Sequence, residues 1–246
     1  MHRLALVAFV ALLLAGCGGH AVTVTVPAPT ATVAKPPQTI TLRAYFLRDG
    51  KVAPVGVVVP KTLAVAAAAT SALVAGTNDP RLTNAVPATK LFQVSSAGDT
   101  VTAHLPVELS HEALAQVVYT LTQFPSIHTA VVNGTSYTRA DFEDVTPTIL
   151  VESPLPEETV RSPLHATGTA NTFEATFDYD LVGPDGTVLA HHFVTATSGS
   201  GTRGTFDFTA PFTPEQSGPG KLVVYEISAA DGSRIHQVEV PIRIGS

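Results

Sequence analysis

The sequence predicts two domains, an α+β domain with two helices on a mixed sheet followed by an all-β sandwich. Three observations lead to this fold class. Helical periodicity is confined to the first part of the chain, strand-like stretches fill the rest, and 45% of the 246 residues are hydrophobic, enough for two cores. We place the first domain at residues 39–145 and the second at residues 146–246.

The first domain opens with a hairpin and a helix. Residues 40–48 and 51–59 have strand character, and Asp49-Gly50 between them is a tight-turn signal. Residues 62–75 repeat apolar side chains at helical spacing and stop at Gly76. The stripe predicted to pack on the sheet consists of Leu63, Ala66, Ala67, Thr70, Leu73 and Val74.

The same domain continues with two strands, a second helix and a last strand, giving the order ββαββαβ. Residues 90–96 and 100–107 are the two strands. Ser110 is a good N-cap for the helix, and Pro125 ends it. A strand then ends at the hairpin signal Asn133-Gly134. The predicted apolar face of the helix is Leu114, Val117, Val118, Leu121 and Phe124.

After about residue 147 every segment reads as a strand. About seven strands are separated by turn signals roughly every 8–12 residues, which is typical of a β-sandwich. Residues 173–181 alternate along this pattern, so that Phe173, Phe177 and their odd-numbered neighbours face inward. The same alternation points Asp178 and Asp180 outward, where carboxylates favour solubility.

The first seventeen residues predict where the protein works. Arg3 precedes an apolar run from Leu4 to Leu14, which is too short to span a bilayer but fits a secretory signal. The run closes with Leu14-Ala15-Gly16-Cys17, and this cysteine is the only one in the chain. These four residues resemble the bacterial lipobox. An ordinary signal peptide with a chance cysteine is the alternative.

The lipobox resemblance implies that residues 1–16 are removed and that Cys17 carries lipid, with acyl chains such as palmitate. Two or more chains hold a protein stably on a membrane. Residues 17–38 are rich in Pro and Thr and read as a tether that reaches roughly 60 Å when extended. We therefore expect a lipid-anchored protein on the extracytoplasmic face of a bacterial cell membrane.

Composition excludes some classes of function. The net charge of −6 argues against nucleic-acid binding, which needs clustered Lys and Arg. With one cysteine, no internal disulfide can form, so packing must stabilise both domains.

Two stretches resemble known families. Residues 40–138 resemble the GerMN domain of sporulation and spore-germination proteins, through LRAYFL, SALVAG, AVPATKL and VVYTLTQFPSIHTAVVNG. One departure is Thr77 after Gly76, where family members commonly have proline. Residues 149–244 resemble the immunoglobulin-like domain of bacterial spore germination, through ILVESPLPEETVRSPLHATGTANTFEATF, GPDGTVL and ISAADG.

These resemblances imply a non-enzymatic envelope lipoprotein that acts as an adaptor or assembly module in sporulation, germination or cell-envelope processes. They imply an envelope protein partner or self-association, with peptidoglycan as a further candidate, and no cofactor. The alternative is a lipoprotein that binds a lipid, glycan or peptidoglycan fragment, which a buried apolar pocket between the domains would favour. The third hypothesis is an unrecognised envelope hydrolase.

The sequence offers no catalytic or metal site. His111-Glu112 starts a zinc-protease pattern, but Ala115 stands where the second histidine is needed. His191 and His192 are adjacent in a strand, so their side chains point to opposite faces. Asp141, Glu143 and Asp144 lack the ligand spacing of a calcium loop and read as a solvated linker.

The glycine-rich stretch SGSGTRG, residues 198–204, lies between two strands. Phosphate-binding loops open a helix instead, so this stretch reads as a hairpin loop. No serine-hydrolase motif follows Cys17, which leaves Cys17 as the single predicted functional residue.

Overall fold

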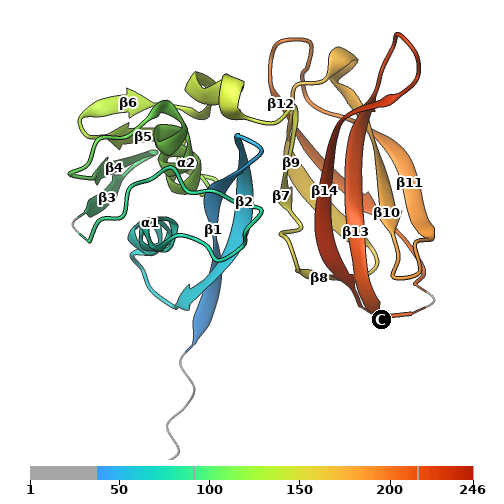
Figure 1. The fold of residues 1–246 in the computed structure, drawn as a ribbon, viewed down its shortest axis with the longest axis horizontal. Helices are drawn as coiled ribbons and strands as arrows, with labels where there is room; N and C mark the ends of the chain where they lie inside the picture. The colour runs from blue at the N-terminus through green and yellow to red at the C-terminus, as the bar shows by residue number, and fades with distance from the viewer. Residues whose placement is uncertain (1–37, 91, 215, 246) are drawn as a thin grey trace, which may run out of the picture. The chain divides into compact units, whose positions relative to one another are not determined.

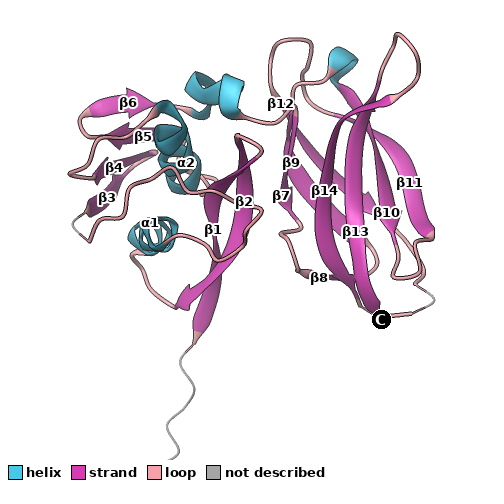
Figure 2. Ribbon diagram, viewed as in Figure 1, coloured by secondary structure: helices cyan, strands magenta, loops and turns pink. Residues whose placement is uncertain are grey.

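The computed structural model describes residues 38–90, 92–214 and 216–245. Among these residues, two helices and six strands precede residue 139, and strands dominate after residue 148 (Figure 1, Figure 2). The predicted fold class, α+β followed by an all-β sandwich, is confirmed. Within these residues, no helix is long and apolar enough to cross a membrane.

A β-hairpin opens the fold. Strand β1 (Thr39–Arg48) pairs antiparallel with β2 (Lys51–Pro60) along its whole length. Asp49 and Gly50 between them have φ of 51° and 76°, as the predicted two-residue turn requires. The hairpin is a sheet of its own, so the six strands of this region form two sheets rather than the single sheet that we expected.

The second sheet has the order β3-β4-β5-β6, and it is mixed because β4 and β5 run parallel. Both outer pairs are antiparallel. Its strands are β3 (Gln93–Ala97), β4 (Thr100–His104), β5 (Thr129–Val132) and β6 (Thr135–Tyr137).

Helix α1 (Val65–Ala75) ends at Gly76 as predicted but begins later than the periodicity suggested. The Thr62 hydroxyl accepts a hydrogen bond from the Ala64 backbone at 3.0 Å, which fixes a turn before the helix. Leu63 therefore lies outside the helix and is fully exposed, so its place in the predicted stripe is wrong. The residues that α1 buries are Ala69, Thr70, Leu73 and Val74.

Helix α2 (His111–Leu121) explains why the hairpin sheet stops at two strands. Ser110 caps it as predicted, because its hydroxyl accepts from the Ala113 backbone at 3.2 Å. Gln123, which follows the helix, bonds both the backbone N–H (2.8 Å) and the C=O (2.7 Å) of Arg43. Thr120 accepts from the Tyr45 N–H at 3.1 Å. Polar side chains thus bond the free edge of β1 at Arg43 and Tyr45, and a backbone bridge to Thr83 bonds it at Leu47.

A short 3₁₀ helix, η1 (Arg139–Val145), connects the α+β region to the sandwich. Thr138 and Asp141 form a reciprocal capping box at its start. The sequence predicts only a change of pattern here, because η1 consists of two short pieces that meet at a non-helical Phe142 (φ −128°), and neither piece is long enough to produce helical periodicity.

The sandwich consists of two sheets, in the orders β11-β10-β13-β14-β8 and β12-β9-β7. Strand β8 is only two residues long, which explains why the sequence predicted about seven strands. The strands are β7 (Ile149–Ser153), β8 (Thr159–Val160), β9 (Leu164–Ala170), β10 (Thr176–Val182), β11 (Val188–Thr195), β12 (Gly204–Ala210), β13 (Gly218–Ile227) and β14 (Arg234–Ile244).

Two details of residues 173–181 differ from the prediction. The first three residues form the 3₁₀ turn η2 (Phe173–Ala175), in which Glu174 has a φ of 52°, and Phe173 is 62% exposed instead of inward-facing. Asp180 lies on the face opposite Tyr179 as expected, yet it is buried. Neighbouring strands cover this carboxylate, which alternation alone cannot reveal.

Strand β7 takes part in two hydrophobic clusters. Leu150 packs with the α+β cluster, around Tyr45, Phe46 and the helices. Ile149 and Val151, on either side of it, pack with the sandwich cluster. The described residues accordingly form one compact unit.

Candidate functional site

Cys17 lies outside the described residues, so the predicted lipidation stays a prediction. The described chain begins at Gln38, whose carbonyl accepts a hydrogen bond from the Lys61 N–H at 2.9 Å.

His111 pairs with Asp144, with 2.9 Å between Nε2 and Oδ1, and it packs 5.1 Å from the Phe142 ring. The pKa of Glu112 lies below its ordinary value because its own backbone N–H and Ser110 bond the carboxylate. Glu112 therefore stabilises the start of α2, and His111 links this helix to Asp144 of η1.

The acidic residues predicted to form a solvated linker point to three different partners. Asp141 bonds Thr138, and Asp144 bonds His111. Glu143 accepts from Arg203 of the loop between β11 and β12 and, at 2.8 Å, from Asn171. Across residues 38–90, 92–214 and 216–245, no group of three His, Cys, Asp or Glu side chains is placed to hold a metal ion.

His191 and His192 separate as predicted. His191 lies 2.8 Å from the buried Asp180, which also accepts from Tyr225 at 3.2 Å and pairs with Arg234 at 2.8 Å. Burial works against the ionised Asp180, but the bonds from His191 and Arg234 outweigh it and lower its pKa. His192 accepts from the Phe193 backbone at 2.8 Å, so it protects the edge of β11.

A half-buried ion pair lies where the sandwich meets the α+β region, and sequence reasoning missed it. Arg139 donates to Glu152 at 2.9 Å, and the Tyr45 hydroxyl donates to the same carboxylate oxygen. Arg139 also bonds the hydroxyl and carbonyl of Thr122 at 2.9 and 3.0 Å. We call Tyr45, Arg139 and Glu152 the junction cluster.

The interactions within the junction cluster shift the pKa values of Glu152 and Tyr45 in opposite directions. Burial alone would raise the pKa of Glu152, but the Arg139 charge and the hydrogen bonds from Tyr45 and Arg139 lower it below its ordinary value. Burial, together with the Glu152 charge, raises the pKa of Tyr45. Tyr45 thus stays a neutral donor to an ionised Glu152. This hydrogen bond and the Arg139–Glu152 ion pair hold the α+β region and β7 together.

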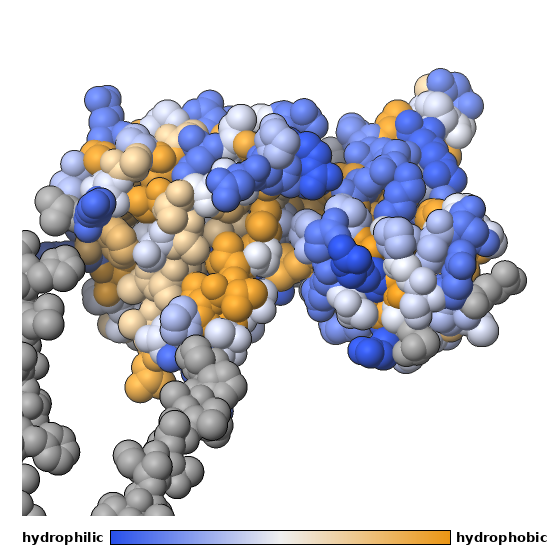
Figure 3. All heavy atoms as spheres, turned by 60° about the horizontal axis from the view of Figure 1, so that its bottom comes forward, coloured by the Kyte–Doolittle hydropathy of each residue, from blue (hydrophilic) through white to orange (hydrophobic). Residues whose placement is uncertain are grey.

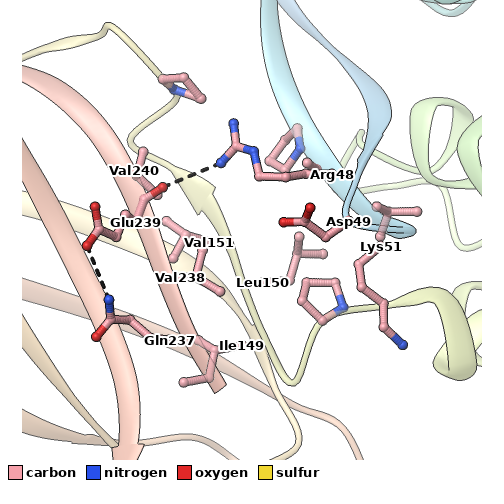
Figure 4. Close-up of a pocket in the computed structure, with 15 residues that line it drawn as sticks. Arg48, Asp49, Lys51, Ile149, Leu150, Val151, Gln237, Val238, Glu239 and Val240 are labelled. Atoms are coloured by element: carbon pink, nitrogen blue, oxygen red, sulfur yellow. Dashed lines mark hydrogen bonds between the residues drawn. The ribbon is translucent and has the colours of Figure 1, made fainter. Parts of the chain in front are cut away.

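One candidate binding site is a pocket of about 380 Å³ beside the β1–β2 turn, which we call the hairpin pocket (Figure 4). Its walls come from the hairpin (Arg48–Pro54), from β7 and from β14. The walls are mostly apolar, whereas Arg48 and Lys51 bring positive charge and Asp49 and Glu239 bring negative charge. The apolar lining residues are Val52, Ala53, Pro54, Pro147, Ile149, Leu150, Val151, Pro156, Val238 and Val240.

Not every N–H group of the Arg48 guanidinium has a hydrogen-bond acceptor in this pocket. Its Nη1 donates to the Glu239 carbonyl at a long 3.5 Å, the contact drawn in Figure 4. Its Nε is shielded from solvent and has no hydrogen-bond partner among the described residues. An unmade buried hydrogen bond costs about 1–3 kcal/mol. The pocket therefore combines an apolar lining with a guanidinium whose Nε lacks an acceptor, which suits binding of an amphipathic anion.

Comparison with known families agrees with this fold. Residues 43–135 match the Germane family, described as "Sporulation and spore germination". Residues 148–233 match the Gmad2 family, described as "Immunoglobulin-like domain of bacterial spore germination". No curated protein matches the chain closely enough to count as a relative.

Both resemblances identified from the sequence are thereby confirmed, and neither family description names an enzyme. The chain is thus similar to a Germane domain over residues 43–135 and to a Gmad2 domain over residues 148–233, and both family descriptions refer to spore germination.

Proposed function

We propose that this protein is a non-enzymatic adaptor, anchored by lipid on Cys17 at the extracytoplasmic face of the bacterial membrane, where it holds an envelope protein partner. The observation that carries the proposal is the link between the two regions. The junction cluster and the Arg203–Glu143 pair join the α+β region to the sandwich, so a partner held by one is positioned by the other.

An exposed apolar surface supports the adaptor role. Figure 3 shows apolar residues gathered on one face of the α+β region. Exposed large apolar side chains of the α+β region include Val58 (70% exposed) and Leu63 (103% exposed). Contiguous exposed apolar surface marks protein or membrane interaction sites.

Complementation tests the anchored adaptor. A soluble version without residues 1–17 should fold normally yet fail to rescue a deletion strain, whereas the full chain should rescue it. A Cys17→Ala variant with an intact leader separates loss of lipid from loss of export. Full rescue by the soluble version, or an unmodified terminus by intact-mass spectrometry, contradicts the proposal.

A ligand-binding lipoprotein is the second candidate, and the hairpin pocket is the observation that favours it. Stabilisation of the purified protein against heat by soluble wall fragments would support this function. An enzyme remains the third hypothesis, and hydrolysis of wall polymers by the purified protein, lost on a single His→Ala change, would support it.

A further inference from the structure

We propose that the hairpin pocket binds the carboxylate end of an extended peptide with small apolar side chains, and that Arg48 receives the carboxylate. This ligand class goes beyond the adaptor role. It rests on the second candidate function, that of a ligand-binding lipoprotein. Three features of the pocket lead to it: the charge of Arg48, the free edge of β14 and the apolar walls.

In the described part of the chain, the Arg48 guanidinium is not paired with a carboxylate, although Asp49 and Glu239 also line the pocket. No carboxylate lies within 4.0 Å of its guanidinium among the described residues, while Lys221 pairs with Glu239 at 3.0 Å. Lys51 donates to the Asp144 carbonyl. A guanidinium binds a carboxylate through strong, charge-assisted hydrogen bonds. An incoming carboxylate would therefore give the Arg48 Nε the acceptor that it lacks.

The edge of β14 beside the pocket offers backbone groups to an extended peptide. Strand β8 covers this edge only at Arg243 and Ile244. The Pro241 carbonyl points away from β13, since it accepts from the Glu157 N–H at 2.7 Å. In an antiparallel ladder residues two apart point the same way, so the N–H and C=O of Glu239 also face outward. Extended peptides bind by adding to such an edge.

The walls and the volume determine which peptide fits. Branched and small side chains, such as Val52, Ala53 and Val240, line the pocket. Its volume of about 380 Å³ lies near the lower end of the roughly 300–1,000 Å³ found for ligand pockets. A short peptide end with small side chains fits this space. A fatty acid would also place a carboxylate on Arg48, but it would leave the β14 backbone groups unused.

Calorimetric titration of the full chain in detergent tests the proposal. The probe is acetyl-Ala-Ala-Ala with a free carboxylate, compared with the same peptide as its C-terminal amide. We expect the amide to bind about tenfold more weakly or worse, the usual effect of losing a hydrogen bond to a charged group. Equal binding of the two peptides, or no binding of either, overturns the inference.

Two variants locate the site. Arg48→Gln should reduce binding of the acid to the level of the amide. Arg243→Gln on the same strand, an exposed residue paired with Glu157 at 3.3 Å, should leave binding unchanged and serves as the matched control. Circular dichroism melts establish that both variants fold, and unaltered binding by folded Arg48→Gln contradicts the assignment.

Decanoate and hydrogen exchange separate peptide from lipid. Bound peptide should slow exchange of the Glu239 backbone amide, because β14 then gains a partner. Binding of decanoate without binding of the peptide would replace the proposed ligand by a lipid and overturn the inference. If wall fragments stabilise the protein while the alanine peptides and decanoate do not bind, the second candidate function survives without this inference. The complementation experiment tests the adaptor role and does not depend on ligand binding.

Discussion

Arg203 holds Glu143 through two hydrogen bonds, of 2.8 Å from Nε and 3.0 Å from Nη2, although 60 residues separate them. The same guanidinium donates to the Pro147 carbonyl at 2.8 Å. It thereby ties the loop between β11 and β12 to the segment that connects the two regions.

Replacing Arg203 by methionine should lower the free energy of unfolding by about 1–3 kcal/mol, because Glu143 and the Pro147 carbonyl lose a charged donor. Urea unfolding of the purified protein measures this change. Arg243→Met is the control, since the side chains of that pair are both 60% exposed and should contribute almost nothing. If Arg203→Met lowers the free energy of unfolding no more than Arg243→Met does, the hydrogen bonds of Arg203 do not contribute to stability.

Removing one partner of the junction cluster should be more severe. Arg139→Met leaves Glu152 ionised, with its side chain only 16% exposed, and we expect a loss of about 3–5 kcal/mol in chemical denaturation. The double variant Arg139→Met/Glu152→Gln should recover part of that loss, because it no longer buries an unpaired charge. A double variant as unstable as the sum of both single variants would contradict this view.

Acid should weaken the junction cluster. The folded-state pKa of Glu152 lies below its ordinary value of 4.5, so its contribution is complete above about pH 4.5 and is lost as pH falls through the folded-state value. Stability measured against pH should therefore fall less steeply in Glu152→Gln than in the wild type. Glu108→Gln, which replaces an exposed carboxylate, should follow the wild-type curve.

Gly168 of β9 should not tolerate a side chain. A Cβ there would lie 2.0 Å from the Leu150 carbonyl oxygen and 2.6 Å from the Phe206 ring. Gly168→Ala should cost about 1–3 kcal/mol or more by overpacking, visible as a lower melting temperature. Thr167→Ala, next to it on the same strand, is the control. An unchanged melting temperature for Gly168→Ala would mean that β7 and β9 are not so closely packed.

Local signals predicted most of the fold. The Asp49-Gly50 turn and the Ser110 helix cap each depend on residues that are close in the sequence, and the structure contains both as predicted. Their geometry depends on φ preferences and on one side-chain hydrogen bond, which a short stretch of sequence contains.

The junction cluster and the buried Asp180 could not be predicted in the same way. Glu152 reads as one polar residue in a short strand, and its partner Tyr45 lies 107 residues earlier. Alternation predicted the face of the strand on which Asp180 lies, but it could not predict that this residue is buried. Its contacts come from other strands, from Tyr225 and Arg234. Pairings over such distances depend on tertiary packing, as do the walls of the hairpin pocket.

Strand β7 constrains how the chain can vary. Leu150 serves one core while Ile149 and Val151 serve the other. Since side chains alternate with a period of two, inserting one residue into β7 would send each of these side chains to the opposite face. Both cores would lose their contacts at once, so this strand must keep its length even where the surrounding loops lengthen or shorten freely.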